Sequence, residues 1–129
     1  MMVVDLTIIW MIQAIFIHWA CDFILQPGDL QSDNERKYIA KHCQSYAASF
    51  SLLSLVLWIA IGNIGANLEH FAAYLLTCIL SHSIIDFILI PVLYKYKNNL
   101  KLLGIFWSLD QIIHISFIVS ALYYFLLDR

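Results

Sequence analysis

Charged side chains are scarce in this chain of 129 residues. Lys, Arg, Asp and Glu together make up 12% of it, whereas 62% of the residues are hydrophobic and the mean hydropathy is +0.80. Soluble globular domains carry about 25% charged residues. The shortage of charge therefore excludes an ordinary water-soluble domain and indicates a protein that lies mainly in lipid.

Features of several familiar site types are also missing. The chain has four glycines and no glycine-rich phosphate loop, which excludes the common nucleotide-binding folds, and nothing favours nucleic-acid binding. Cys21, Cys43 and Cys78 are scattered without a C-x-x-C spacing, so we expect neither a disulfide framework nor a zinc knuckle. We interpret these cysteines as small packing residues.

Long hydrophobic stretches are present instead. A transmembrane helix takes roughly 20 residues at about 1.5 Å per residue. The stretches that fit are residues 6–25, 42–61, 71–93 and 102–127. The sequence therefore predicts an all-α polytopic membrane protein, a single domain over residues 1–129 with four transmembrane helices in a bundle.

The basic residues predict the orientation of these helices. Six of the seven Lys and Arg residues fall between the first and second spans or between the third and fourth: Arg36, Lys37, Lys41, Lys95, Lys97 and Lys101. Because cytoplasmic loops are enriched in Lys and Arg, we expect both of these loops in the cytoplasm and both termini outside. The same residues could attract anionic membrane lipids or an anionic headgroup.

The two halves of the chain resemble each other. Residues 18–27 read HWACDFILQP and residues 82–91 read HSIIDFILIP, so six identities recur 64 positions apart. This pattern predicts two parallel two-helix repeats, residues 1–64 and 65–129, related by a pseudo-two-fold axis along the membrane normal. Each copy ends in a proline, which predicts that the helices end just before Pro27 and Pro91.

Histidines and aspartates recur inside the predicted spans at helical spacing. His18 and Asp22, His82 and Asp86, and Asp110 and His114 are each four residues apart, so each pair shares one helical face. His42, with Tyr46 one turn later, adds a group from the second span. Counted from the cytoplasmic ends, the three pairs lie about 5 to 16 Å deep, which predicts a single polar layer.

Such a layer needs compensation within a bilayer. One central Asp costs about 2.5 to 3.5 kcal/mol, and three cost roughly 8 to 10 kcal/mol if unpartnered. A divalent cation would compensate, with zinc favoured and manganese or iron as alternatives, as one ion or as two. The candidate metal ligands are His18, Asp22, His42, His82, Asp86, Asp110 and His114. Asp22 and Asp110 are the candidate general bases, and Tyr46 could steady a developing negative charge.

Four motifs carry a resemblance to a known family. H-W-x-x-D-F-x-x-Q at 18–26, H-x-x-x-Y at 42–46, H-x-x-x-D at 82–86 and D-Q-x-x-H at 110–114 resemble an uncharacterised family of small bacterial and phage integral membrane proteins. This resemblance implies the bacterial inner membrane but brings no established activity. The S-H-S around His82 is loosely similar to inner-membrane metal-dependent hydrolases, although their upstream histidine is missing here.

The leading interpretation is an enzyme, a membrane-embedded metal-dependent hydrolase. Its site would open to the cytoplasm and cleave a phosphoester or related bond of a lipid-like substrate. The alternative is a transporter or sensor of divalent metal ions or protons, since intramembrane Asp–His chains also form relays. A di-iron oxidoreductase or a purely structural His–Asp network would be further uses of the same residues, and the sequence leaves a homo-oligomer open.

Overall fold

The computed structural model describes residues 6–25, 29–60 and 68–127, and these residues are helical apart from short connections. The helices are α1 (Leu6–Trp19), the π-helical turn η1 (Ala20–Ile24), α2 (Glu35–Ala60), α3 (Leu68–Lys95), α4 (Leu100–Leu122) and the π-helical turn η2 (Tyr123–Leu127). No strand occurs in these ranges. The predicted all-α fold class is confirmed.

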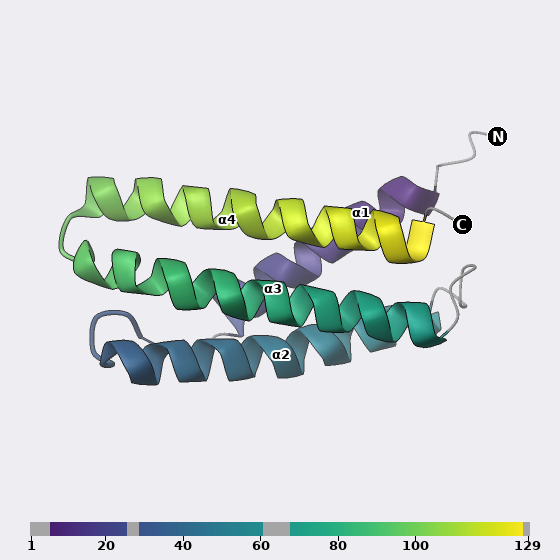
Figure 1. Ribbon diagram of the computed structural model, residues 1–129, viewed down its shortest axis with the longest axis horizontal. Helices are drawn as coiled ribbons and strands as arrows, with labels where there is room; N and C mark the ends of the chain where they lie inside the picture. The colour runs from purple at the N-terminus through teal and green to yellow at the C-terminus, as the bar shows by residue number, and fades with distance from the viewer. Residues whose placement is uncertain (1–5, 26–28, 61–67, 128–129) are drawn as a thin grey trace.

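The helices form a bundle in which α1 and α3 each pack against both α2 and α4. Figure 1 shows α2, α3 and α4 running along the long axis of the molecule, with α1 inclined to them. All four helices therefore present one face to a shared interior.

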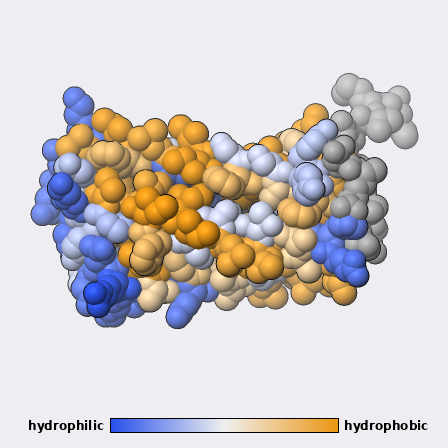
Figure 2. Space-filling view, in the orientation of Figure 1, coloured by the Kyte–Doolittle hydropathy of each residue, from blue (hydrophilic) through white to orange (hydrophobic). Residues whose placement is uncertain are grey.

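The surface of the bundle is apolar around its middle. Three helical segments are long and apolar enough to cross a membrane, Glu35–Ala60, Leu68–Lys95 and Leu100–Leu127, and Ile8–Ile24 is a shorter apolar one. Large hydrophobic side chains point outward, for example Phe87, which is 71% exposed. In Figure 2 hydrophilic residues gather at the end where α3 is joined to α4. This distribution is compatible with an integral membrane protein; residues 61–67, between α2 and α3, and both chain ends lie outside the described residues.

Two apolar cores fill the interior at different levels. The first core includes Trp10, Ala14, Tyr46, Phe50, Phe71, Tyr74, Cys78, Ile118 and Leu122, and the second consists of Leu30, Tyr38, Ile90, Leu93 and Leu103. On α3 and α4 the chain passes from one core to the other through His82 and Asp86, and through Asp110 and His114. The predicted polar layer therefore lies between two apolar layers.

The helix end predicted before Pro91 is wrong, because α3 continues through Pro91 to Lys95. A proline inside a helix lacks the N–H donor and costs about 3 kcal/mol or more. Ile90 and Leu93, on either side of it, are buried in the second core, and this packing holds the helix together past the proline. Pro27, the proline of the other copy, lies outside the described residues.

Candidate metal centre

All seven candidate ligands meet in one layer of the bundle. α1 and η1 supply His18 and Asp22, α2 supplies His42, α3 supplies His82 and Asp86, and α4 supplies Asp110 and His114. Each of these residues is at most 6% exposed. Helical spacing alone predicted three His–Asp pairs on three helices. The structure brings these pairs together with His42 of the remaining helix.

The carboxylate of Asp22 faces histidines on two sides. Its Oδ1 atom lies 2.8 Å from Nε2 of His42 and 3.6 Å from Nε2 of His82. Its Oδ2 atom lies 3.8 Å from Nε2 of His18. Asp22 therefore lies between the histidine of its own helix and those of α2 and α3.

The carboxylate of Asp86 is placed in the same way. Its Oδ2 atom lies 3.1 Å from Nε2 of His42 and 2.9 Å from Nε2 of His82, and its Oδ1 atom lies 3.4 Å from Nε2 of His114. The layer can thus be divided into a first subsite, around His42 and His82, and a second subsite, around His18 and His114. Asp22 and Asp86 each turn one oxygen toward the first subsite and the other oxygen toward a histidine of the second.

The donor atoms fit a divalent cation. Among the described residues three overlapping groups have donor atoms within 4.8 Å of one another: His18, Asp22 and His114; Asp22, His42 and His82; and His82, Asp86 and His114. Tetrahedral ligands at 2.0–2.1 Å from a zinc ion would lie about 3.3 Å apart. The nitrogen–oxygen distances around Asp22 and Asp86 run from 2.8 to 3.8 Å and bracket this value.

Two atoms of the layer support this fit further. Oδ1 of Asp22 and Nε2 of His82 are buried and make no hydrogen bond within the described part of the chain. Nevertheless, His42 Nε2 approaches the first atom to 2.8 Å and Asp86 Oδ2 approaches the second to 2.9 Å. Close approach without hydrogen-bond geometry is expected when donor atoms face a common point rather than each other, and buried polar atoms rarely stay unpaired without such a reason.

Tyr46 and Asp110 lie behind the histidines. The Tyr46 hydroxyl is 2.8 Å from Nδ1 of His18, and its ring stacks on the His82 ring with centroids 3.4 Å apart. Oδ2 of Asp110 lies 3.4 Å from Nδ1 of His114. Both residues therefore contact the ring nitrogen that faces away from the centre, a position that fixes the orientation of a metal-binding imidazole.

Gln111 belongs to the site although sequence reasoning gave it no role. Its amide nitrogen donates hydrogen bonds to Oδ2 of Asp22 at 2.6 Å and to Oδ2 of Asp110 at 3.1 Å. Its amide oxygen lies 3.2 Å from Nε2 of His18, the same nitrogen that faces Asp22. The signal was present in the D-Q-x-x-H motif at 110–114, but adjacent helical residues point about 100° apart, so spacing alone did not link Gln111 to the layer.

The cysteines differ in their surroundings. Cys21 and Cys78 are buried in the first core, in keeping with a packing role. Cys43 is half-buried, and its Sγ lies 3.9 Å from Oδ2 of Asp86. One cysteine expected to be a packing residue therefore contacts the polar layer.

A π-helical turn carries Asp22. The regular helix of α3 holds His82 and Asp86 2.9 Å apart, whereas His18 and Asp22 are separated by 3.8 Å across the start of η1. Among the histidines, Asp22 instead lies nearest to His42 of α2, at 2.8 Å. Turns of this type are frequent at functional sites, and here the turn coincides with a residue that joins two helices of the centre.

A charged cluster fixes the connection that leads into α2. Lys41 Nζ lies 2.9 Å from Oδ2 of Asp33, and Lys37 Nζ lies 3.0 Å from its Oδ1. These two ammonium groups, first that of Lys41, hold the pKa of Asp33 well below its usual range, together with the backbone N–H of Asp29. Since His42 follows Lys41 directly, this cluster anchors the turn of α2 that enters the polar layer.

Comparison with known protein families gives a match that covers most of the chain. The sequence model of a family described as "Protein of unknown function (DUF3307)" matches residues 10–128, a range that contains every residue of the centre. No curated protein and no solved structure matches the chain.

Proposed function

Because the chain belongs to the DUF3307 family, whose function is unknown, we propose its function from the geometry of the centre. The proposed function is that of a membrane-embedded metal-dependent hydrolase. It would cleave a phosphoester or related bond of a lipid-like substrate with the His/Asp layer as its metal centre.

The observation that carries this proposal is the position of the two carboxylates between the two subsites. Asp22 and Asp86 each direct one oxygen toward His42 and His82 and the other toward His18 or His114. Carboxylates whose two oxygens point toward different subsites are the usual bridging ligands in dinuclear metal centres. Paired divalent cations supply Lewis acidity at neutral pH, which activates water and polarises a phosphoryl or carbonyl oxygen.

The donor set favours zinc, with manganese or iron as alternatives. Four imidazoles and two carboxylates give each subsite a mixture of nitrogen and oxygen donors, which suits these ions better than magnesium or calcium. Asp22 and Asp86 would act as ligands, and Tyr46 would hold the His18 ring in place through its hydroxyl group.

Asp110 is our candidate for the general base. It lies outside the three donor groups, next to His114, and its Oδ1 atom is buried and without a hydrogen bond among the described residues. That oxygen is available to accept a proton from water, while its Oδ2 atom keeps His114 oriented.

Transport is the weaker alternative because the interior is closed on one side of the centre. The first core occupies the space beyond His18, His82 and His114, where Phe50, Tyr74 and Leu122 are at most 2% exposed. A transporter would need polar groups to continue through this level. A centre closed at one end is better suited to a reaction than to passage.

We further propose that the protein crosses the bacterial inner membrane four times, as two parallel repeats with both termini outside. The common packing of α1 and α3 against α2 and α4 supports the repeat, because symmetry mates should have equivalent neighbours. The basic residues around the α3–α4 connection support a cytoplasmic position for that end.

Hydrolysis by metal-loaded protein is the test. Detergent-purified protein would be assayed against phosphomonoester, phosphodiester and carboxylester lipids, before and after a chelator and after zinc is restored. We expect turnover of one class, abolished by the chelator, restored by zinc and absent in Asp86→Ala, while His70→Ala, at the far end of α3, keeps its activity. Metal-loaded protein that hydrolyses none of these lipids would contradict the proposed function.

A further inference from the structure

A hollow on the side of the bundle leads to the centre. It has a volume of about 470 Å³ and is lined by Phe23, Gly104, Trp107, Ser108, Gln111 and Ile112. A second hollow of about 340 Å³ shares Phe23 and Trp107 with it and continues toward Asp29 and Gln31 at the end of the bundle. We call the two together the η1–α4 groove.

Gln111 forms the inner end of this groove. It lines the first hollow, and the same side chain hydrogen-bonds Asp22, Asp110 and His18. The ligands themselves are buried, whereas Gln111 is half-buried. A molecule in the groove would therefore meet the centre at Gln111.

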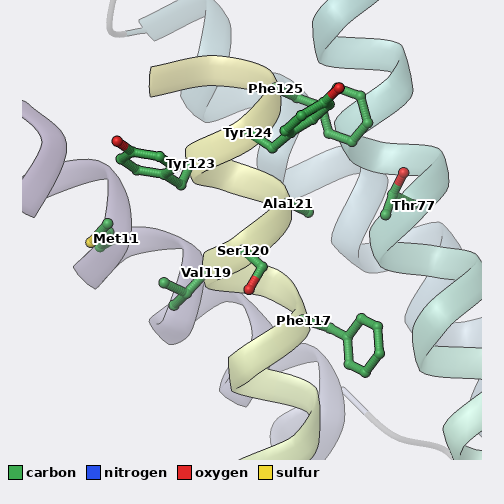
Figure 3. A pocket seen from close by; sticks show the side chains of 9 residues that line it. All are labelled: Met11, Thr77, Phe117, Val119, Ser120, Ala121, Tyr123, Tyr124 and Phe125. Atoms are coloured by element: carbon green, nitrogen blue, oxygen red, sulfur yellow. The ribbon is translucent and has the colours of Figure 1, made fainter. Parts of the chain in front are cut away.

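A different hollow, of about 620 Å³, offers no such link. Figure 3 shows it around the end of α4, with Met11 of α1 on one side and Thr77 of α3 on the other. Within the described residues no hydrogen bond or ion pair joins the residues that line this hollow to the polar layer. The hydroxyl of Ser120, one of these residues, donates a hydrogen bond to the carbonyl oxygen of Ser116. The larger volume of this hollow therefore does not identify it as a path to the centre.

The η1–α4 groove faces the region that lipid occupies in a membrane. Its rim is apolar: Ile112 is 62% exposed, and Phe23 and Trp107 are 38% and 37% exposed. Gln111 lies about 16 Å along α4 from Leu100, the first residue of the helix. At that depth the side opening of the first hollow faces the bilayer, whereas the second hollow extends to the end of the bundle.

We propose that a membrane lipid enters the centre sideways through the η1–α4 groove, with Gln111 as the gate. The reaction of the lipid in the centre rests on the proposed function, whereas the path through the groove does not depend on it. The acyl chains would stay among the bilayer lipids along Phe23, Trp107 and Ile112, and the polar linkage would reach Gln111. The first hollow is within the 300–1,000 Å³ typical of small-molecule sites.

Gly104 allows the groove to be filled without disturbing the fold. A Cβ atom added there meets no other atom within 4 Å, and residue 104 is exposed in the groove. Gly104→Leu should therefore occupy the groove, while Gly104→Ala leaves most of it open. Ser120→Leu, which places the same side chain at the hollow of Figure 3, is the control.

The test is photolabelling in vesicles of phosphatidylcholine that contain a phosphatidylcholine with a diazirine on one acyl chain. Labelled positions would be mapped by mass spectrometry on the full-length protein, and the metal content of each sample measured. We expect labelling concentrated at Trp107 and Ile112, lost in Gly104→Leu and kept in Gly104→Ala and Ser120→Leu. Labelling spread evenly around the bundle, or unchanged in Gly104→Leu, would overturn the path. The metal content tests only the proposed function and the labelling tests only the path, so the proposed function and the path can fail separately.

Discussion

The two ring nitrogens of His18 and of His114 have different surroundings in this protein. Nε2 of His42, His82 and His114 lies near a carboxylate of the centre, whereas Nδ1 of His114 faces Asp110. His18 follows the same rule, with Nδ1 at the Tyr46 hydroxyl. Residues at this outer position set the ring orientation, and their loss usually lowers metal affinity by about 10- to 100-fold.

Tyr46→Phe tests that role, because it keeps the ring that stacks on His82 and removes only the hydroxyl that contacts His18. We expect zinc affinity, measured by competition with a chelator, to fall by about 10-fold. Stability should fall by only about 1 kcal/mol, the usual contribution of one hydrogen bond. Unchanged affinity in a folded variant would show that Tyr46 only packs.

Gln111→Met removes the hydrogen bonds to Asp22, Asp110 and His18 and preserves the volume of the side chain. We expect a loss of zinc affinity of about 10- to 100-fold in the same competition assay. Gln13→Met, a glutamine of α1 outside the polar layer, is the matched control and should keep its affinity. Equal losses in both variants would argue against a specific role for Gln111.

At the scale of the helices, the helical periodicity of the sequence predicted most of the residues that form the site. The i, i+4 spacing of His82 and Asp86 corresponds to a direct contact in α3, because that helix is regular there. It did not predict the π-helical turn at Asp22 or the passage of α3 through Pro91, since both depend on packing between helices. Gln111 was missed for the same reason: its partners come mainly from α1 and η1, and a single helix does not reveal them.

The start of α2 gives a prediction for pH. Because the pKa of Asp33 is lowered in the folded protein, its pairing with Lys41 and Lys37 stabilises the fold above the unfolded pKa, about 3.9, and is lost as the pH falls below it. We expect Asp33→Asn to have a lower thermal unfolding midpoint than the wild type at pH 7. The difference should shrink below about pH 4. A difference that is constant with pH would mean that the charge of Asp33 does not stabilise this connection.

Along their middle sections the described helices are apolar on the outside and carry His and Asp side chains on the inside, the reverse of a soluble bundle. Its exposed surface includes Phe16, Phe87 and Ile112, while His18, His82 and His114 are at most 2% exposed. Such groups are costly in a bilayer unless a partner compensates them. This cost explains why polar and ionisable side chains, including Cys43 and Gln111, contact one another throughout the layer.

The orientation of the bundle can be tested with single cysteines in a variant that lacks Cys21, Cys43 and Cys78. Lys101→Cys lies in the first turn of α4 and Glu69→Cys in the first turn of α3, at opposite ends of the bundle. With a membrane-impermeant thiol reagent, we expect Glu69→Cys to be labelled in intact bacterial cells and Lys101→Cys only in inverted vesicles. Labelling of both from the same side would contradict the proposed topology.

The most direct test of the metal centre is elemental analysis of the detergent-purified protein. Wild type would be compared with His18→Ala, Asp86→Ala and His114→Ala, with His70→Ala as the control and circular dichroism as the check on folding. The geometry predicts about two equivalents of a transition metal in the wild type and the control, and a clear loss in the three folded site variants. Wild-type protein that binds no metal after reconstitution with zinc, manganese and iron would contradict the metal centre and leave the layer as a hydrogen-bonded network between helices.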